Sequence, residues 1–228
     1  MKIKASSFML TGFSCCAGLV LALGILFSLQ GWGVRAARAG TSAELTVCAS
    51  GCDFDRVQDA ALAANSGDVI KIAAGVYTGV QSISGSTQMV IVTKTLTLRG
   101  GYSPDFSVWD PALYTTTLDA EGQGRVVYAS GAVTVTLDGL QMVNGYNNSS
   151  GAGVYAVDST LYVLNSTIGN NRLAPHFNGN YGVGLSISNG YLSMQSSIVQ
   201  GNEPLPGGDY SHDGGGLYAI ESTVEISN

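Results

Sequence analysis

The sequence predicts an all-β protein in which short strands stack into a solenoid, one coil upon the next. Composition is the first observation: of 228 residues only 11% are charged, whereas 31 are glycine, which favours short strands joined by tight turns. The second is a repeat. Similar segments begin at Gly153, Gly184 and Gly216, and a period near 30 residues with two or three strands per unit is typical of a β-solenoid.

The first 39 residues have the features of an export segment. Lys2 and Lys4 precede a stretch without charge, residues 5–34, and a small-residue motif then offers a cleavage site between Ala39 and Gly40. The apolar stretch is also long enough to serve as an uncleaved N-terminal membrane anchor. A cleaved signal peptide is the favoured interpretation. Under both, residues 40–228 form a secreted or cell-surface domain, and only the N-terminal segment contacts a membrane.

After this segment the chain is acidic, with 16 acidic residues against six basic ones. A body with this charge repels phosphate backbones, so nucleic acid is excluded as a partner. Cys48 and Cys52 are the two cysteines of the body. In an oxidising compartment we expect them to form a disulfide. Two thiols cannot complete a tetrahedral zinc shell, so no metal is expected there.

A short helix is expected over residues 53–65, ahead of the strands. Asp53 is the expected N-cap, and Phe54, Val57, Ala61 and Leu62 share one helical face. The Asn-Ser-Gly sequence that begins at residue 65 ends the helix. Since no second long helix follows, a βαβ fold is excluded.

Strands are expected next at residues 69–72, 89–92 and 96–98, and repeats from about residue 118 onward. Within the repeats, alternating apolar residues predict inward-facing ladders, made by Leu161, Val163, Leu192, Met194, Val224 and Ile226. Asn171 and Asn202 close successive units. We expect their side-chain amides to hydrogen-bond along the stack.

Several of these segments resemble a known family. Residues 54–77, with Val-Gln-Asp-Ala at 57–60, Ser-Gly-Asp at 66–68 and Ala-Gly-Val-Tyr at 74–77, resemble the N-terminal cap of pectin-lyase-like proteins. Leu118 to Gly122, followed by Val-Val-Tyr at 126–128, is similar to their first-coil motif. Residues 168–171 and 216–219 are similar to parallel β-helix repeats, and distantly to outer-membrane adhesin repeats. Ile168 and Val199 depart from the adhesin pattern, which has Phe at their position.

The resemblance covers roughly residues 45–228 and implies a right-handed parallel β-helix with a short capping helix. The fold hosts lyases, hydrolases and non-enzymatic surface proteins, so it does not by itself imply one function. Lyases of this family use clustered Asp residues for Ca²⁺ and an Arg or Lys base, and its glycosidases use Asp residues on consecutive coils. Neither pattern is visible in this sequence.

Candidate binding residues lie in three long connections, residues 145–151, 172–181 and 203–215, which fall at the same point of successive coils. In a solenoid such connections gather on one side and form a binding face. Aromatic rings there can stack on sugars. The candidates are Tyr146, Arg172, His176, Tyr181, Asp209, Tyr210, His212 and Asp213. The residues at 209–213 could bind Ca²⁺ or do acid–base work, but a polar Gly-rich loop is the favoured interpretation. Asp119 and Glu121 similarly read better as a turn than as a carboxylate pair.

Together these features predict an exported scaffold that binds carbohydrate or acts as an adhesin, without a catalytic constellation or cofactor. The alternative is a polysaccharide lyase or glycoside hydrolase whose active coils lie beyond Asn228. The last residues, 222–228, end in mid-unit by comparison with earlier coils. We therefore expect a longer natural chain, or an end that pairs with another element.

Overall fold

The structure, a computed structural model, describes residues 42–83, 85–175, 182–206 and 215–228. The N-terminal segment and its cleavage site, Ala39 and Gly40, lie outside these residues. Residues 40–228 group into one compact unit. In the described part of the chain no helix is long and apolar enough to cross a membrane.

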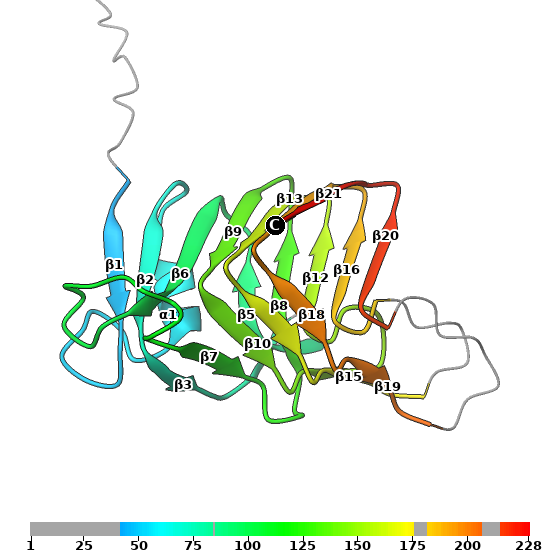
Figure 1. Cartoon of the computed structure of the whole chain (residues 1–228), viewed down its shortest axis with the longest axis horizontal. Helices are drawn as coiled ribbons and strands as arrows, with labels where there is room; N and C mark the ends of the chain where they lie inside the picture. Colours follow the sequence, from blue (N-terminus) through cyan, green and yellow to red (C-terminus); the bar gives the residue numbers. More distant parts are fainter. Residues whose placement is uncertain (1–41, 84, 176–181, 207–214) are drawn as a thin grey trace, which may run out of the picture. The chain divides into compact units, whose positions relative to one another are not determined.

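The unit is all-β, with strands arranged in mainly parallel sheets (Figure 1). A seven-stranded sheet has the order β1 (Glu44–Val47), β2 (Val69–Ala73), β6 (Leu96–Tyr102), β9 (Thr134–Asp138), β13 (Thr160–Leu164), β17 (Tyr191–Gln195) and β21 (Thr223–Ser227). A five-stranded sheet has the order β18 (Ile198–Gln200), β14 (Thr167–Gly169), β10 (Leu140–Val143), β7 (Thr116–Asp119) and β3 (Gly75–Tyr77).

Two further sheets complete the architecture. A six-stranded sheet has the order β20 (Leu217–Ile220), β16 (Leu185–Ser188), β12 (Val154–Val157), β8 (Arg125–Ser130), β5 (Ser86–Val92) and β4 (Gln81–Ile83), with β4 antiparallel to β5. A three-stranded sheet consists of β11 (Tyr146–Asn147), β15 (Arg172–Leu173) and β19 (Glu203–Pro204). From β9 onward the chain visits the seven-, five-, three- and six-stranded sheets in this order, coil after coil, an arrangement compatible with a β-solenoid.

The predicted inward ladders form with the expected register. Leu161 pairs with Val135 on one side and Leu192 on the other, and all three are buried in one continuous core cluster. Such burial is the main stabilising term, about 25 cal/mol per Å² of apolar surface removed from water. The last pair of the ladder differs. Ile226 is in register with Met194 but is 70% exposed, because β17 is the only strand that β21 pairs with among the described residues.

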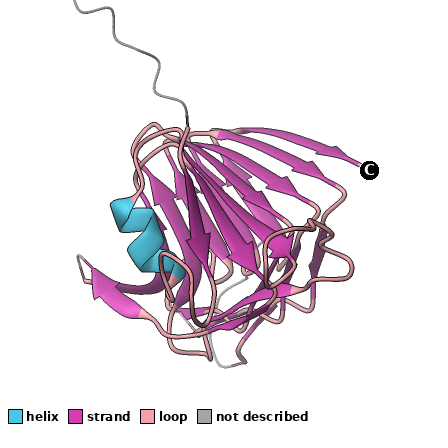
Figure 2. Cartoon of the chain, turned by 90° about the vertical axis from the view of Figure 1, so that its left-hand side faces the viewer, coloured by secondary structure: helices cyan, strands magenta, loops and turns pink. Residues whose placement is uncertain are grey.

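The helix is shorter than predicted. α1 covers Val57–Ala63, and its N-cap position is Arg56, which makes no side-chain capping hydrogen bond. Asp53 is therefore not the N-cap; its Oδ2 instead accepts hydrogen bonds from Thr46 N (2.8 Å) and Thr46 Oγ1 (2.7 Å). Leu62, expected on the buried face, is 59% exposed. The helix buries Val57, Gln58, Ala60 and Ala61, and packs against β5, β1 and β2 at the side of the stack (Figure 2).

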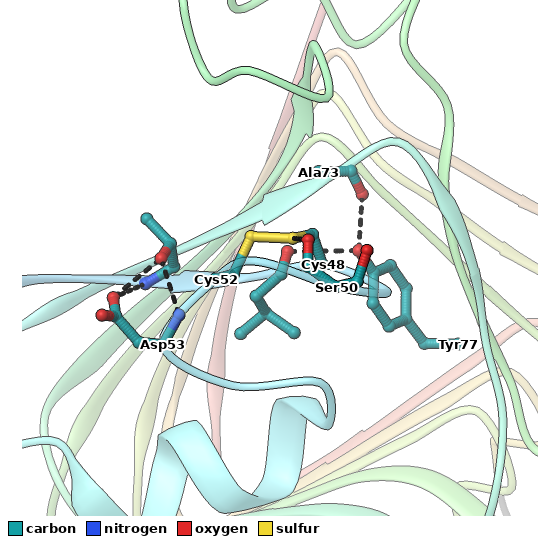
Figure 3. Close-up of a disulfide and its surroundings, with 8 residues drawn as sticks. Cys48, Ser50, Cys52, Asp53, Ala73 and Tyr77 are labelled. Atoms are coloured by element: carbon teal, nitrogen blue, oxygen red, sulfur yellow. Dashed lines mark hydrogen bonds between the residues drawn. A yellow bond between two sulfur atoms is a disulfide. The ribbon is translucent and has the colours of Figure 1, made fainter.

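A disulfide joins Cys48 and Cys52 just after β1 (Figure 3). It closes the loop that returns the chain to Phe54, which forms a parallel bridge with Val47. Tyr77 lies close by, and its hydroxyl is within hydrogen-bonding distance of the carbonyl oxygens of Ala73 (3.0 Å) and Val47 (3.2 Å). Burial raises the pKa of Tyr77 to about 12.

Candidate functional site

A ladder of two asparagines shapes the turn in front of the three-stranded sheet. Asn171 is fully buried, and its Oδ1 accepts a hydrogen bond from Gly145 N (2.7 Å). Its Nδ2 donates to Met142 O (3.3 Å) and to Asn202 Oδ1 (2.9 Å). Asn202 Nδ2 in turn donates to Ile168 O (3.0 Å). The predicted amide stacking is therefore confirmed, and it ties three successive coils together through groups that are removed from water.

Glycines make room for this ladder. A Cβ atom on Gly153 would lie 2.4 Å from Gly184 O and 2.7 Å from Asn171 Nδ2. A Cβ atom on Gly184 would lie 2.6 Å from Asn202 Nδ2. Side chains larger than hydrogen would thus displace the asparagines. The glycines that begin the first two of these sequence repeats, Gly153 and Gly184, are explained by this close approach of backbone and amide.

The three-stranded sheet sets the wall of the candidate site. Tyr146 on β11 is in register with Arg172 on β15, which is in register with Glu203 on β19. All three side chains are exposed, whereas Leu173, the next residue on β15, is buried with Ala152 and Val183. Because successive side chains of a strand point to opposite faces, an aromatic ring, a cation and an anion lie in a row across the outer face of this sheet.

Tyr146 and Arg172 line a groove with a volume of about 480 Å³. The groove lies where β7, β10 and β14 end and β11 and β15 begin. Its other lining residues are mostly polar: Asp119, Glu121, Gly122, Asn144, Gly145, Asn170 and Leu205. We call this set of nine residues the end-strand groove. Its volume is within the range that small-molecule sites have in proteins.

The two acidic residues of the groove belong to a turn, as the sequence favoured. Asp119 Oδ1 accepts hydrogen bonds from Glu121 N (2.8 Å) and from Asn144 Nδ2 (3.0 Å). Glu121 itself has a φ of 53°, in the left-handed region. The hydrogen bonds from the turn fix the Asp119 carboxylate, while the Glu121 side chain remains exposed.

The groove offers both hydrogen-bond donors and acceptors to a ligand, because its cation is not paired with its carboxylates. Among the described residues Arg172 forms no ion pair, so its guanidinium can donate to a ligand. Carboxylate and amide oxygens of the other lining residues can accept hydrogen bonds. The described part of the chain contains no group of three or more His, Cys, Asp or Glu side chains that could hold a metal ion. The groove is therefore equipped to bind a polar, uncharged or mixed-charge ligand.

The structure brings together two of the residues that the sequence predicted, Tyr146 and Arg172. The other six candidates lie outside the described residues: His176, Tyr181, Asp209, Tyr210, His212 and Asp213.

Besides Gly122 and Gly145, five groove residues were not among the candidates predicted from the sequence: Asp119, Glu121, Asn144, Asn170 and Leu205. Four of them sit at the ends of strands of the five-stranded sheet or in the turn that follows, and Glu121, Asn144 and Asn170 have positive φ angles. The sequence signal that could have identified Asn144 and Asn170 is an asparagine at the end of a repeat unit, since Asn readily adopts a positive φ angle.

Comparison with known proteins gives no match for this chain, whether against family models, curated proteins or solved structures.

Proposed function

We propose that this chain is an exported scaffold that binds carbohydrate through the end-strand groove. The observation that carries the proposal is that Tyr146 and Arg172 lie in register on one wall, beside the Asp119 and Asn144 side chains. A tyrosine ring can stack on the apolar face of a sugar. Charged and amide groups around it can hydrogen-bond the hydroxyls.

The fold that we propose is a right-handed parallel β-helix of the pectin-lyase-like kind. Two features support it: the parallel strands that recur in the same sheets coil after coil, and the short helix α1 between β1 and β2. The motifs at residues 54–77 and 118–128 support it independently. Export is supported by the N-terminal charge and apolar pattern of residues 1–39.

Binding without catalysis is the version of the proposal that the groove favours. Asp119, the best-fixed carboxylate, already accepts two hydrogen bonds that hold the turn. A residue with this structural task is poorly suited to exchange protons in a reaction. The rival, a polysaccharide lyase or glycoside hydrolase with active coils beyond residue 228, is one outcome of the test below.

The test is binding to a panel of soluble polysaccharides, including pectin, alginate and neutral glucans, by affinity electrophoresis with residues 40–228. We expect retardation by at least one polysaccharide. Tyr146→Ala and Arg172→Gln should each weaken it about tenfold, which corresponds to about 1.4 kcal/mol of binding free energy. Parallel samples contain Ca²⁺ or a chelator, so that any metal requirement is measured directly.

The matched control is Tyr162→Ala. Tyr162 is a tyrosine of the seven-stranded sheet that packs against Tyr191 in a tilted arrangement (ring centroids 6.0 Å apart) and is absent from the groove lining. It should leave retardation unchanged. If Tyr162→Ala weakens binding as much as Tyr146→Ala does, the groove is not the binding site. Release of unsaturated or shortened products during incubation would contradict the non-enzymatic version.

A further inference from the structure

A second cavity lies on the six-stranded sheet, around Arg125 at the start of β8. It has a volume of about 430 Å³ and shares no lining residue with the end-strand groove. Much of its wall is apolar or aromatic, formed by Ile83, Ile91, Tyr128 and Tyr155. Its polar groups include Arg125 and Gln88, which are register partners on β8 and β5.

The Arg125 guanidinium is held in one orientation by hydrogen bonds to the loop between β11 and β12. Its Nε donates to Gly151 O (2.7 Å). Its Nη2 donates to Ser150 O (2.9 Å) and to Ser149 Oγ (3.3 Å). These acceptors are neutral oxygens, so they orient the guanidinium without cancelling its charge.

Two tyrosine rings flank the same guanidinium. Its Cζ lies 5.0 Å from the ring centroid of Tyr155 and 5.5 Å from that of Tyr128. The rings themselves pack against each other at an interplanar angle of 35°, with centroids 5.8 Å apart. A planar cation beside two aromatic faces is a pre-organised site, because little conformational freedom remains to be lost when a ligand binds.

The charge of Arg125 has no counter-charge within the described part of the chain. Arg125 is only 3% exposed, and it forms no ion pair with a described carboxylate. Burial lowers the pKa of Arg125 to about 10, so the side chain remains a cation at neutral pH. Beside it, Gln88 is 1% exposed and its Oε1 accepts no hydrogen bond. A buried charge without a counter-charge, or a buried acceptor without a donor, destabilises the folded state unless a partner supplies the missing group.

We propose that this cavity binds a small organic acid with an apolar body. The carboxylate accepts charge-assisted hydrogen bonds from Nη1 of Arg125, the guanidinium nitrogen that makes none with the described residues. The apolar body lies against Tyr128, Tyr155 and Ile91. The site is thus distinct in chemistry from the polar groove proposed to bind carbohydrate.

The first test needs no variant. Mandelate carries a carboxylate, a hydroxyl and a phenyl ring, and mandelamide is its uncharged counterpart. Calorimetric titration of residues 40–228 should show saturable binding of mandelate, with mandelamide at least tenfold weaker. Glucuronate, an acid without an apolar body, and inorganic phosphate should also bind more weakly than mandelate. Equal binding of mandelate and mandelamide, stronger binding of glucuronate or phosphate, or no mandelate binding up to about 10 mM would overturn the proposal.

Variants then locate the site. Arg125→Gln should weaken mandelate binding at least tenfold, whereas Arg172→Gln, in the end-strand groove, should leave it unchanged. Because Arg125 also holds the loop at Gly151, a second variant is needed that keeps these hydrogen bonds. Tyr155→Leu does so and should weaken mandelate several-fold by removing one flanking ring. Unchanged affinity in Tyr155→Leu, or in folded Arg125→Gln, contradicts the assignment.

Discussion

Asn171 Nδ2 donates a hydrogen bond to Asn202 Oδ1 across 2.9 Å, and thereby links the interiors of two successive coils. The same Asn171 side chain accepts from Gly145 N and donates to Met142 O in the preceding coil. A single buried amide therefore serves three coils at once.

Asn171→Ala should lower the free energy of unfolding by about 3 kcal/mol. The substitution removes three side-chain hydrogen bonds and leaves Gly145 N without its acceptor, and an unsatisfied buried group costs about 1–3 kcal/mol. Urea denaturation followed by circular dichroism measures the change. Asn148→Ala, at an exposed asparagine of the 145–151 loop, is the control and should stay within about 0.5 kcal/mol of the unchanged chain.

Gly153→Ala should destabilise the protein by about 1–3 kcal/mol, because the new Cβ would lie 2.4 Å from Gly184 O. Gly216→Ala is the matched control. Gly216 begins the unit after that of Gly184, but a Cβ there meets Val199 Cγ1 at 3.5 Å, an ordinary contact. The same denaturation measurement applies. Equal losses for the two variants would show that close approach to the ladder is not the reason for glycine at the start of a unit.

Acid should weaken the first coil through Asp68. Hydrogen bonds from Asn65 N and Ala43 N lower the pKa of Asp68 below its ordinary value of 3.8. A carboxyl with a lowered pKa in the folded state contributes stability above pH 4, and this contribution is lost as the pH falls through the folded-state pKa. Asp68→Asn should therefore have a lower melting temperature than the unchanged chain at pH 7. The gap should shrink below pH 3, and a gap that is constant with pH would contradict this.

Removal of the disulfide should cost about 2 kcal/mol. A bridge between Cys48 and Cys52, four residues apart, closes a short loop, and short loops give the smaller part of the range expected from chain entropy. The Cys48→Ser, Cys52→Ser double variant should show this loss in urea denaturation. Reducing agent should produce the same loss in the unchanged chain and none in the double variant, which separates the effect of the bridge from that of the serines.

The repeating part of the fold could be predicted closely from the sequence. Leu161 and Val163 occupy alternate positions of one strand and Leu192 the matching position of the next, and inward packing of such a pattern determines the register. The place of Asn171 was predictable from the repeat, because an asparagine, Asn202, stands at the same point of the next unit. Ile226 was predicted as buried because periodicity carries no information about whether a further strand covers it.

The start of the helix and most of the end-strand groove could not be predicted in this way. Asp53 has the residue type of an N-cap, but Thr46 on β1 competes for its carboxylate, and that contact is not local in sequence. Tyr146 and Arg172 could be paired because both lie in equivalent connections. Asp119 and Arg125 belong to a coil with weaker repeat signals, so their places in the two cavities depend on strand register that only the three-dimensional structure reveals.

The strands of the three-stranded sheet pair at equivalent positions of successive coils, so removing one coil would bring its two neighbours into the same pairing. Removing residues 153–183 would excise one unit and join Ala152 to Gly184, which occupies the position of Gly153 in the next unit. β11 would then lie beside β19, so that Tyr146 faces Glu203 in place of Arg172. Excision of a single unit would thus invert the charge beside the aromatic ring.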